Sequence, residues 1–487
     1  MSGLLTWLTF VPVIGMVVIL FMPRERHLLI KIVAAAATGV SLVLSVALFM
    51  AFDRTTSDIQ FVERAAWIPS FNINYFVGID GLSVSLVILT ALLSFLCIFA
   101  SWNIGKAIKA YFALFLLLEA GMIGVFVALD FFLFYVFWEV MLLPMYFLIG
   151  IWGGPRREYA AIKFFLYTLL GSVLMLLGIL ALYFHGGAHT FDMMVLWANN
   201  DYARTFQLWV WAALFVGFAI KVPVFPFHTW LPDAHVEAPT AISVILAGVL
   251  LKMGGYGILR VCFPMLPEAT RAYALPLAVL GVINIIYGAL CAMAQKDLKK
   301  LVAYSSISHM GYVLMGSAAL TVAGVNGGVL QMFNHGTTTA MLFLLVGVIY
   351  DRAHHRDIEG FGGLANIMPV YTGIVALAFF ASLGLPGLSS FISEALVFLG
   401  TFPVYRTAAI IAAVGIVLTA GYILWTIQRM FMGKVNEKYM NLPDINGREL
   451  FTLVPLGILV ILLGVYPSPV LDLMQSTVQN LIGVVQP

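Results

Sequence analysis

Residues 219–257 read AIKVPVFPFHTWLPDAHVEAPTAISVILAGVLLKMGGYG, and this stretch decides how the chain folds. Two lysines, Lys221 and Lys252, lie in sequence that is apolar enough to form membrane helices. The segment between them contains four prolines: Pro223, Pro226, Pro232 and Pro239. A lysine near the centre of a bilayer costs several kcal/mol, so such a residue generally marks a functional site. Two of them beside a helix broken by prolines predict a path for an ion or a proton.

The composition indicates a polytopic membrane protein. Charged residues make up 10% of the 487 residues, against roughly 25% in soluble domains. Hydrophobic residues make up 62%, and the formal net charge of +2 gives no reason to expect nucleic-acid binding. The three cysteines have neither pairing nor metal-ligand spacing, so we expect small buried side chains at Cys97, Cys262 and Cys291.

The apolar segments predict an all-α fold with about fourteen transmembrane helices. A span needs about 20 apolar residues to cross roughly 30 Å of hydrocarbon. Such segments lie at about 3–22, 28–52, 76–101, 110–129, 131–152, 161–184, 207–226, 240–262, 272–294, 301–322, 326–350, 368–401, 406–431 and 451–474. The first apolar segment lacks the basic region and the small-residue cleavage site of a signal peptide, so we expect it to be retained in the protein. The three longer connections, 53–75, 185–206 and 432–450, are expected to be loops, the first two with short amphipathic or extended segments.

The distribution of basic residues predicts the orientation. Of the 25 lysines and arginines, Lys221 and Lys252 lie inside spans, and six lie after even-numbered spans: Arg54, Arg64, Arg204, Arg260, Arg271 and Arg406. The remaining 17 follow odd-numbered spans. Loops rich in lysine and arginine stay in the cytoplasm. We therefore expect both termini to face the periplasm, in a bacterial inner (cytoplasmic) membrane.

Two spans are expected to be broken, at corresponding places in two halves of the chain. Prolines interrupt the seventh span and its following loop, and the sequence LPGLSS at 385–390 interrupts the twelfth. This arrangement is typical of inverted repeats in transporters. We expect one membrane domain over 1–487, with the first three helices in 1–109, one five-helix repeat in 110–262, a second inverted repeat in 272–431, and the last helix in 451–474.

Glu139 and Lys221 are the first pair of candidate site residues. Glu139 lies eight residues into the fifth span, about 12 Å deep at 1.5 Å per residue. An ionised carboxylate at that depth needs a partner of opposite charge, and the candidate is Lys221 in the seventh span. A neighbouring carboxylate favours the charged form of a buried lysine. Separating the two groups is expected to release the lysine proton, whereas a static ion pair is the structural alternative.

Lys252, His309 and His335 extend the predicted path. Lys252 has no acidic residue near it in sequence and lies far from both ends of its span, which argues against a lysine that reaches the membrane surface. His309 and His335 lie in the tenth and eleventh spans, among serines and threonines that can hold water. Histidine titrates near neutral pH, so we expect a relay role for both rather than simple hydrogen bonding in the core.

The acidic residues of the later spans complete the candidates. Glu394 follows the break in the twelfth span and is a candidate proton exit, or alternatively a cap of the second half-helix. Glu119 is a supporting acid, and Asp130 is expected to cap the fifth span. The polar residues of the broken seventh segment are expected to satisfy freed backbone groups or line water rather than bind a metal: His228, Asp233, His235 and Glu237. The sequence has no nucleotide-binding, CxxC or haem-attachment motif.

Five motifs resemble those of one known family. They are VGIDGLSVSLVILT at 77–90, FWEVMLLPMY at 137–146, the run of 221–257 quoted above, QKDLKKLVAYSSISHMGY at 295–312, and LGLPGLSSFISE at 383–394. With them, essentially the whole chain resembles the antiporter-like subunits of proton-pumping NADH:quinone oxidoreductase, respiratory complex I. The glutamate at 394 favours the chain M (mitochondrial chain four) branch over chains L and N and the D-type subunits of sodium/proton antiporters, which usually carry lysine there.

The resemblance implies a fold, residue roles and partners. It implies fourteen helices with two inverted five-helix repeats and broken helices seven and twelve. Glu139 would pair with Lys221, Lys252 would be the central lysine, and Glu394 the terminal residue, with protons passing His309 and His335. The chain would be a non-redox, proton-translocating part of the enzyme. Other membrane subunits, including other antiporter-like chains, are the expected partners, and NAD, FMN, iron–sulfur clusters and quinone are expected in partner subunits.

Three alternatives remain at this stage. A cation/proton antiporter subunit would transport sodium without NADH. A structural spacer would leave the proton/electron stoichiometry unchanged when Lys252 is removed. A hydrogenase-linked complex would copurify with different peripheral subunits.

Overall fold

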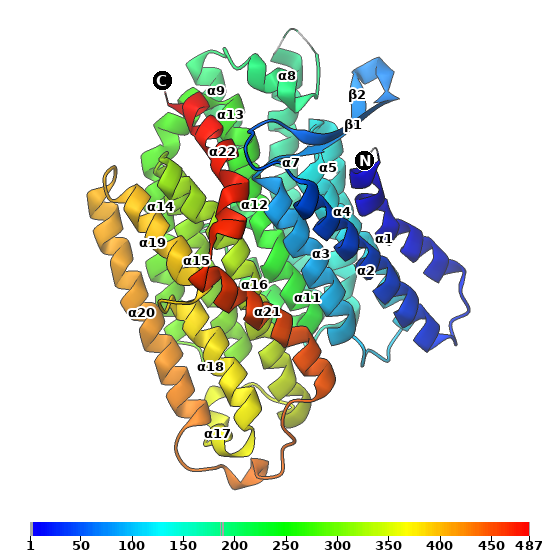
Figure 1. The fold of residues 1–487 in the computed structure, drawn as a ribbon, viewed down its shortest axis with the longest axis vertical. Helices are drawn as coiled ribbons and strands as arrows, with labels where there is room; N and C mark the ends of the chain where they lie inside the picture. The colour runs from blue at the N-terminus through cyan, green and yellow to red at the C-terminus, as the bar shows by residue number, and fades with distance from the viewer. Residues whose placement is uncertain (1–2, 186, 188, 487) are drawn as a thin grey trace.

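The computed structural model describes residues 3–185, 187 and 189–486. Most helices run roughly along one direction, and both termini lie at the same end of the bundle, at the top of Figure 1. The loops between α1 and α2 and between α20 and α21 lie at the opposite end. We name this lower end the basic-loop end, because the loop arginines and lysines Arg24, Arg26, Lys434 and Lys438 lie there.

Eleven helical stretches among the described residues are long and apolar enough to cross a membrane. They are α1 (Leu4–Phe21), α2 (His27–Ala51), α3 (Ser83–Ala100), α4 (Ile108–Val127), α5 with α6 (Phe131–Val140 and Leu142–Trp152), α7 (Arg157–His185), α11 to α13 (within Thr240–Met265), α14 (Pro267–Met293), α16 (Val322–Ala353), α20 (Arg406–Phe431) and α21 (Gly447–Val465). Each coincides with one of the predicted spans. The predicted all-α membrane fold is confirmed.

Shorter or more polar helices occupy the other three predicted spans. They are α9 (Arg204–Lys221), α15 (Leu298–Ala318), and the pair α18 (Pro369–Leu383) and α19 (Ser389–Thr401). The remaining helices are α8 (Met193–Ala198), α10 (Trp230–Glu237), α17 (Leu364–Ile367) and α22 (Ser468–Val485), with 3₁₀ turns η1 (Pro69–Phe71), η4 (Ile358–Gly360) and η5 (Glu437–Tyr439).

The ends of two predicted spans are wrong. The segment 76–101 becomes helical only at Ser83, because residues before it form strand β2 (Ile73–Ile79), which pairs antiparallel with β1 (Gln60–Ile68). This hairpin supplies the extended segment expected in 53–75. The segment 451–474 ends as a helix at Val465, and α22 starts at Ser468 after Pro467, since a proline lacks the N–H that a continuing helix needs.

Helix irregularities gather around the candidate residues. The expected single helix 131–152 is interrupted at Met141, two residues after Glu139. The segment 240–262 contains two π-helical turns, η2 (Leu246–Leu250) and η3 (Ile258–Cys262), with α12 (Leu251–Gly257) between them and α11 (Thr240–Ile245) and α13 (Phe263–Met265) outside. π turns occur often at functional sites. Their wider backbone path frees carbonyl groups to accept other donors.

Two central elements are buried along their whole membrane length. The apolar windows of Thr240–Met265 and α16 are fully buried, whereas only a third of the residues are buried in those of α1, α2 and α20. These three helices lie at the two lateral edges of Figure 1. The exposed side chains there are apolar, such as Val43 and Val417. They provide the surface expected to face lipid, while α11–α13 and α16 carry the polar groups inside.

Candidate functional site

Lys252 and His335 are in direct contact at the centre of the fold. Lys252 is fully buried, and its Nζ lies 2.7 Å from Nδ1 of His335 on α16. The same Nζ donates to the carbonyl oxygen of Ala247, which belongs to the π turn η2. The irregular backbone thus provides an acceptor for a lysine that has no acidic neighbour in sequence. This contact joins two residues that were predicted separately.

Two glycines allow the helices to approach closely enough for this contact. A Cβ placed on Gly336 would lie 2.5 Å from Leu89 of α3 and 3.0 Å from the carbonyl oxygen of Gly248 in η2. A Cβ on Gly248 would lie 2.4 Å from Leu93. Larger residues would therefore push α3, α16 and η2 apart, and would separate Lys252 from His335.

His309 continues the chain of polar groups towards Glu394. The ring centroids of His309 on α15 and His335 are 5.7 Å apart. Nε2 of His309 lies 3.0 Å from Oγ of Ser382, and its Nδ1 lies 3.4 Å from Oε1 of Glu394. All of these side chains are buried. Four of the six predicted site residues therefore form one continuous series: Lys252, His335, His309 and Glu394.

Glu394 lies against the break between α18 and α19. It is the sixth residue of α19, whereas the helix begins after Leu388, so it does not cap the helix as the alternative interpretation had it. Gly384 ends α18 with a φ of +80°, and a Cβ there would lie 2.8 Å from Oε2 of Glu394. The carboxylate thus faces the turn that the LPGLSS sequence makes.

Lys221 lies apart from this series, at the last position of α9. Its Nζ is buried, has no hydrogen-bond partner among the described residues, and lies 5.4 Å from the ring centroids of both Trp138 and Phe164. Aromatic faces attract a cation by about 0.5–2 kcal/mol. The aromatic rings therefore provide a partial substitute for a carboxylate.

The expected direct pair between Glu139 and Lys221 is not formed in this structure. The two side chains are not within the 4.0 Å of an ion pair, and Oε1 of Glu139 is buried without a partner. Glu119 on α4 is fully buried, as expected of an interior acid, and neither of its oxygens has a partner. Asp130 accepts from the N–H groups of Phe132 and Leu133, which confirms it as the cap of the fifth span.

The acidic residues of α10 are engaged in ion pairs. Asp233 lies 2.7 Å from Nζ of Lys163, and Glu237 lies 3.6 Å from the guanidinium of Arg156 while also accepting from its backbone N–H. The expectation that these acids line water or satisfy freed backbone thus holds only for Glu237. Among the described residues, no three His, Cys, Asp or Glu side chains are grouped closely enough to hold a metal ion.

A buried arginine was missed by the sequence analysis. Arg260 was assigned to a loop, but it lies in η3 and donates to both carboxylate oxygens of Asp80 and to Oη of Tyr256. Both charged side chains are almost completely buried. The signal available in the sequence was an arginine inside the apolar run ILRVCF. The pair fixes the start of α3 to the π turn η3.

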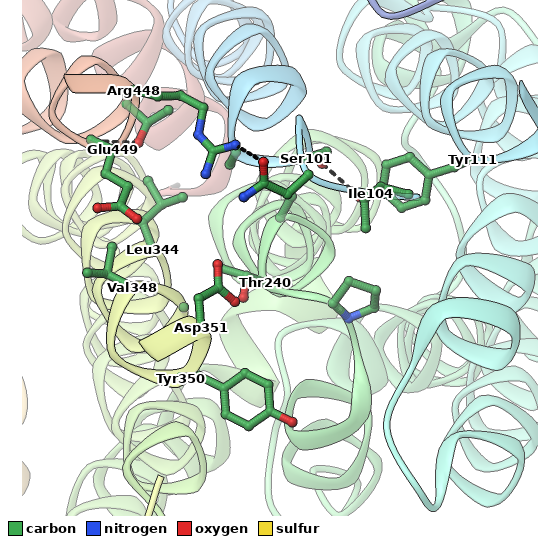
Figure 2. A pocket seen from close by; sticks show the side chains of 16 residues that line it. Ser101, Ile104, Tyr111, Thr240, Leu344, Val348, Tyr350, Asp351, Arg448 and Glu449 are labelled. Carbon is green, nitrogen blue, oxygen red and sulfur yellow. Dashed lines mark hydrogen bonds between the residues drawn. The ribbon is translucent and has the colours of Figure 1, made fainter. Parts of the chain in front are cut away.

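A cavity of about 270 Å³ opens at the basic-loop end. Figure 2 shows Asp351, Thr240, Ser101, Arg448 and Glu449 around it. Arg448 donates to the side-chain oxygen of Asn103, so the start of α21 is bonded to the loop after α3. The polar lining of the cavity includes Thr240, the first residue of α11. The same helical segment continues to α12, which carries Lys252.

Comparisons with known proteins cover the whole chain. A family described as NADH:quinone oxidoreductase/Mrp antiporter, TM, matches residues 128–419, and one described as NADH-ubiquinone oxidoreductase chain 4, amino terminus, matches residues 8–128. NADH-quinone oxidoreductase subunit M of Rhodobacter capsulatus is 45% identical over 502 residues, covering 99% of this chain and 97% of the relative. NADH-ubiquinone oxidoreductase chain 4 of Arabidopsis thaliana is 44% identical, covering 98% and 97%.

Solved structures have the same fold. Respiratory complex I from Thermus thermophilus with bound NADH contains a chain that superposes with a TM-score of 0.90 at 29% identity, covering 99% of this chain and 100% of that one. The Mrp complex from Dietzia sp. DQ12-45-1b contains another, with a TM-score of 0.88 at 23% identity and coverage of 100% and 99%. This second similarity is a similarity of fold alone.

Proposed function

The chain belongs to the antiporter-like family of NADH:quinone oxidoreductase membrane subunits, in the branch of subunit M and chain 4, and from this premise we propose how its residues carry protons across the membrane. The observation that supports the proposal is the buried series Lys252, His335, His309 and Glu394. Each member can gain and lose a proton. Nζ of Lys252 lies 2.7 Å from the ring of His335, and the ring of His309 lies 3.4 Å from Glu394, while the ring centroids of the two histidines are 5.7 Å apart.

In this proposal Lys252 receives a proton and Glu394 releases it. The lysine passes the proton to His335, with which it shares a hydrogen bond, and His309 connects that ring to the carboxylate. Histidine suits both middle positions because one ring nitrogen accepts a proton while the other donates one. The break between α18 and α19 gives Glu394 access to the polar backbone of the turn.

Lys221 and Glu139 act as the switched site. A buried ammonium without a hydrogen-bond partner is unstable relative to its neutral form, and a nearby negative charge offsets that cost. Moving Glu139 towards Lys221 favours the charged lysine, and moving it away favours release. The present separation corresponds to the state in which the proton is held least tightly.

The chain supplies proton translocation, and its partners supply the redox chemistry. It acts as the translocase part of the enzyme, beside other membrane subunits that include further antiporter-like chains. NAD, FMN, iron–sulfur clusters and quinone belong to partner subunits. We assign the basic-loop end to the cytoplasm and both termini to the periplasm. Two inverted units, over 110–262 and 272–431, place the two broken helices in equivalent positions.

Substitution of Lys252 tests the function. Lys252→Met keeps the size of the side chain and removes the titrating group. NADH-driven proton pumping by the complex in reconstituted vesicles is therefore expected to fall by about tenfold or more, since a positioned acid–base group typically contributes about 10²–10⁴-fold. Lys434→Met, in the loop after α20, is the control and is expected to pump normally. Normal pumping by an assembled Lys252→Met complex, or sodium transport without NADH, would contradict the proposal.

A further inference from the structure

Asn284 on α14 bonds the break that follows Lys221. Its side chain is fully buried. Oδ1 accepts from the N–H of Phe225 at 2.8 Å, and Nδ2 donates to the carbonyl oxygen of Pro223, also at 2.8 Å. Both partners lie in residues 222–229 between α9 and α10, which we name the proline turn. One side chain thus pairs a donor and an acceptor of the same turn.

The proline turn leaves backbone groups that a continuous helix would have paired. In such a helix the N–H of Phe225 would donate to the carbonyl oxygen of Lys221, four residues earlier. The carbonyl oxygen of Pro223 would accept from Phe227, whose N–H donates to Val224 instead, at 2.6 Å. Backbone groups at membrane depth must be paired within the protein. Asn284 supplies both missing partners, and so holds the turn that directly follows Lys221.

The same level of α14 is fixed to α15, the helix that carries His309. The carbonyl oxygen of Ile285, the residue after Asn284, accepts from Oγ of Ser308 at 2.8 Å. A Cβ on Gly288 would lie 2.6 Å from the backbone nitrogen of Ser308, so the two backbones are in close contact there. Two consecutive residues of α14 therefore bond the turn after Lys221 and the residue before His309.

We infer that Asn284 is a positioning residue, which holds the proline turn, and with it Lys221, at a fixed place relative to His309. The inference rests on the proposed function, in which Lys221 is the switched site and His309 belongs to the conducting series. Asn284 carries no proton itself, because an amide does not titrate. Its two hydrogen bonds join the turn to α14, and the bond between Ile285 and Ser308 joins α14 to α15. A displacement of the turn is thereby transmitted to α15 rather than absorbed within the loop.

The first test separates the hydrogen bonds of Asn284 from its shape. Asn284→Leu keeps the branched shape and removes both bonds, whereas Asn284→Gln keeps the amide and adds a methylene group. In the intact complex reconstituted into vesicles, NADH-driven proton pumping per assembled complex is expected to fall by about tenfold in Asn284→Leu, since a displacement of about 1 Å can cost up to ~100-fold. Asn284→Gln is expected to pump better than Asn284→Leu. A packing role predicts the reverse order, because an added methylene group is itself destabilising, and that order overturns the inference.

Thr270→Val is the matched control. Thr270 also lies on α14, is buried, and makes two hydrogen bonds: it accepts from Nε1 of Trp211 on α9 at 3.1 Å and donates to the carbonyl oxygen of Cys262 at 3.0 Å. It lies about 21 Å from Asn284 along the helix, at 1.5 Å per residue. Thr270→Val is therefore expected to pump normally. A loss as large as that of Asn284→Leu would mean that any contact between α9 and α14 has this effect, and the inference would fail.

Ser308→Ala tests the second link, because it removes the bond between α14 and α15 without changing a titrating group. If the two links act in series, Asn284→Leu combined with Ser308→Ala pumps no worse than the more impaired single variant, whereas independent effects multiply. Multiplied losses, normal pumping in Ser308→Ala, or failure of both Asn284 variants to assemble overturns the inference. Normal Asn284→Leu beside impaired Lys221→Met overturns this inference alone. Normal Lys221→Met overturns the proposed function itself.

Discussion

The two broken helices of this protein hold their ionisable residues in opposite ways. In the first, α9 ends at Lys221 and α10 starts at Trp230, and the lysine has aromatic rings around it but no polar partner. In the second, α18 ends at Leu383 and α19 starts at Ser389, and Glu394 lies close to the ring of His309. The first break follows an isolated cation, and the second break is followed by a partnered acid.

Within the proposed function, this difference assigns the switched role to the first break and the conducting role to the second. An isolated buried charge responds strongly to any charge that moves nearby, because little else compensates it. A histidine beside a carboxylate can donate a proton to it or accept one from it. The protonation of the carboxylate therefore follows the protonation of the histidine. We therefore expect substitutions at the first break to be more damaging to pumping than those at the second.

The largest expected effect is at Lys221. Lys221→Met keeps the contact with Trp138 and Phe164 but removes the titrating group, so NADH-driven pumping in reconstituted vesicles is expected to fall by about tenfold or more. The complex is expected to assemble with unchanged or higher thermal stability, since an unpaired buried charge is removed.

Lys221→Arg sharpens this test. A guanidinium keeps the positive charge but does not release its proton in a protein. It is therefore expected to pump as poorly as Lys221→Met. If Lys221→Arg pumps as well as the unmodified protein, then the charge alone is sufficient, and Lys221 does not exchange protons.

A smaller effect is expected at Glu394. Glu394→Gln leaves an oxygen near Nδ1 of His309 and keeps the packing against Gly384, while Ser382 still holds the other ring nitrogen. Pumping is expected to fall by about threefold, less than the range typical of losing a lone acid–base group. A greater loss in Glu394→Gln than in Lys221→Met, measured in the same vesicles, would reverse the comparison between the two breaks.

The smallest effect is expected at the start of α18, where the second broken helix meets the basic-loop end. Asp444, from the loop before α21, accepts from the N–H groups of Val370 and Tyr371 at the start of α18, whereas α9 starts without a side-chain cap. Burial opposes ionisation of Asp444, but the N–H groups of Ile445, Val370 and Tyr371 and the charge of Arg352 lower its pKa below the ordinary value. Asp444→Ala is expected to cost about 1 kcal/mol, the typical value of such a cap.

The lowered pKa also determines the pH dependence of this contact. The unfolded carboxyl binds a proton more readily than the folded one, so the stabilisation is present above the unfolded pKa of about 4 and is lost as the pH falls through the lower folded value. Hydrogen exchange of the first amides of α18 measures the stabilisation that the Asp444 cap provides. Asp472→Asn, at an exposed position, is the control. If these amides exchange equally slowly in Asp444→Ala and in the unmodified protein at neutral pH, the cap contributes nothing.

Much of the fold was predictable because a long apolar segment in this composition has one main explanation, a helix that crosses the membrane. Lipid requires long apolar helices, so segments such as 28–52 and 406–431 coincide closely with α2 and α20. The candidate site residues were also recognisable, because a charge such as Lys252 in apolar sequence is rare. The start of α3 and the end of α21 were less predictable, since apolar strand residues and an amphipathic helix extend the same hydropathy signal.

The remaining features depend on contacts that sequence does not display. The contact of Lys252 with His335 requires the close approach that Gly248 and Gly336 allow between distant segments. The π turns around Lys252 follow from tertiary packing rather than from local propensity. Lys221 faces the rings of Trp138 and Phe164 rather than Glu139, and apolar periodicity alone does not specify where those rings lie.

The burial of α16 has an evolutionary consequence. Every residue from Gly324 to Ile349 is buried, so this helix presents no face to lipid. A lipid-facing position accepts most apolar residues, but a position enclosed on all sides must match several neighbours in shape at once. We therefore expect accepted substitutions to be fewest along α16, and replacements there to occur together with changes in α3, α15 and α19.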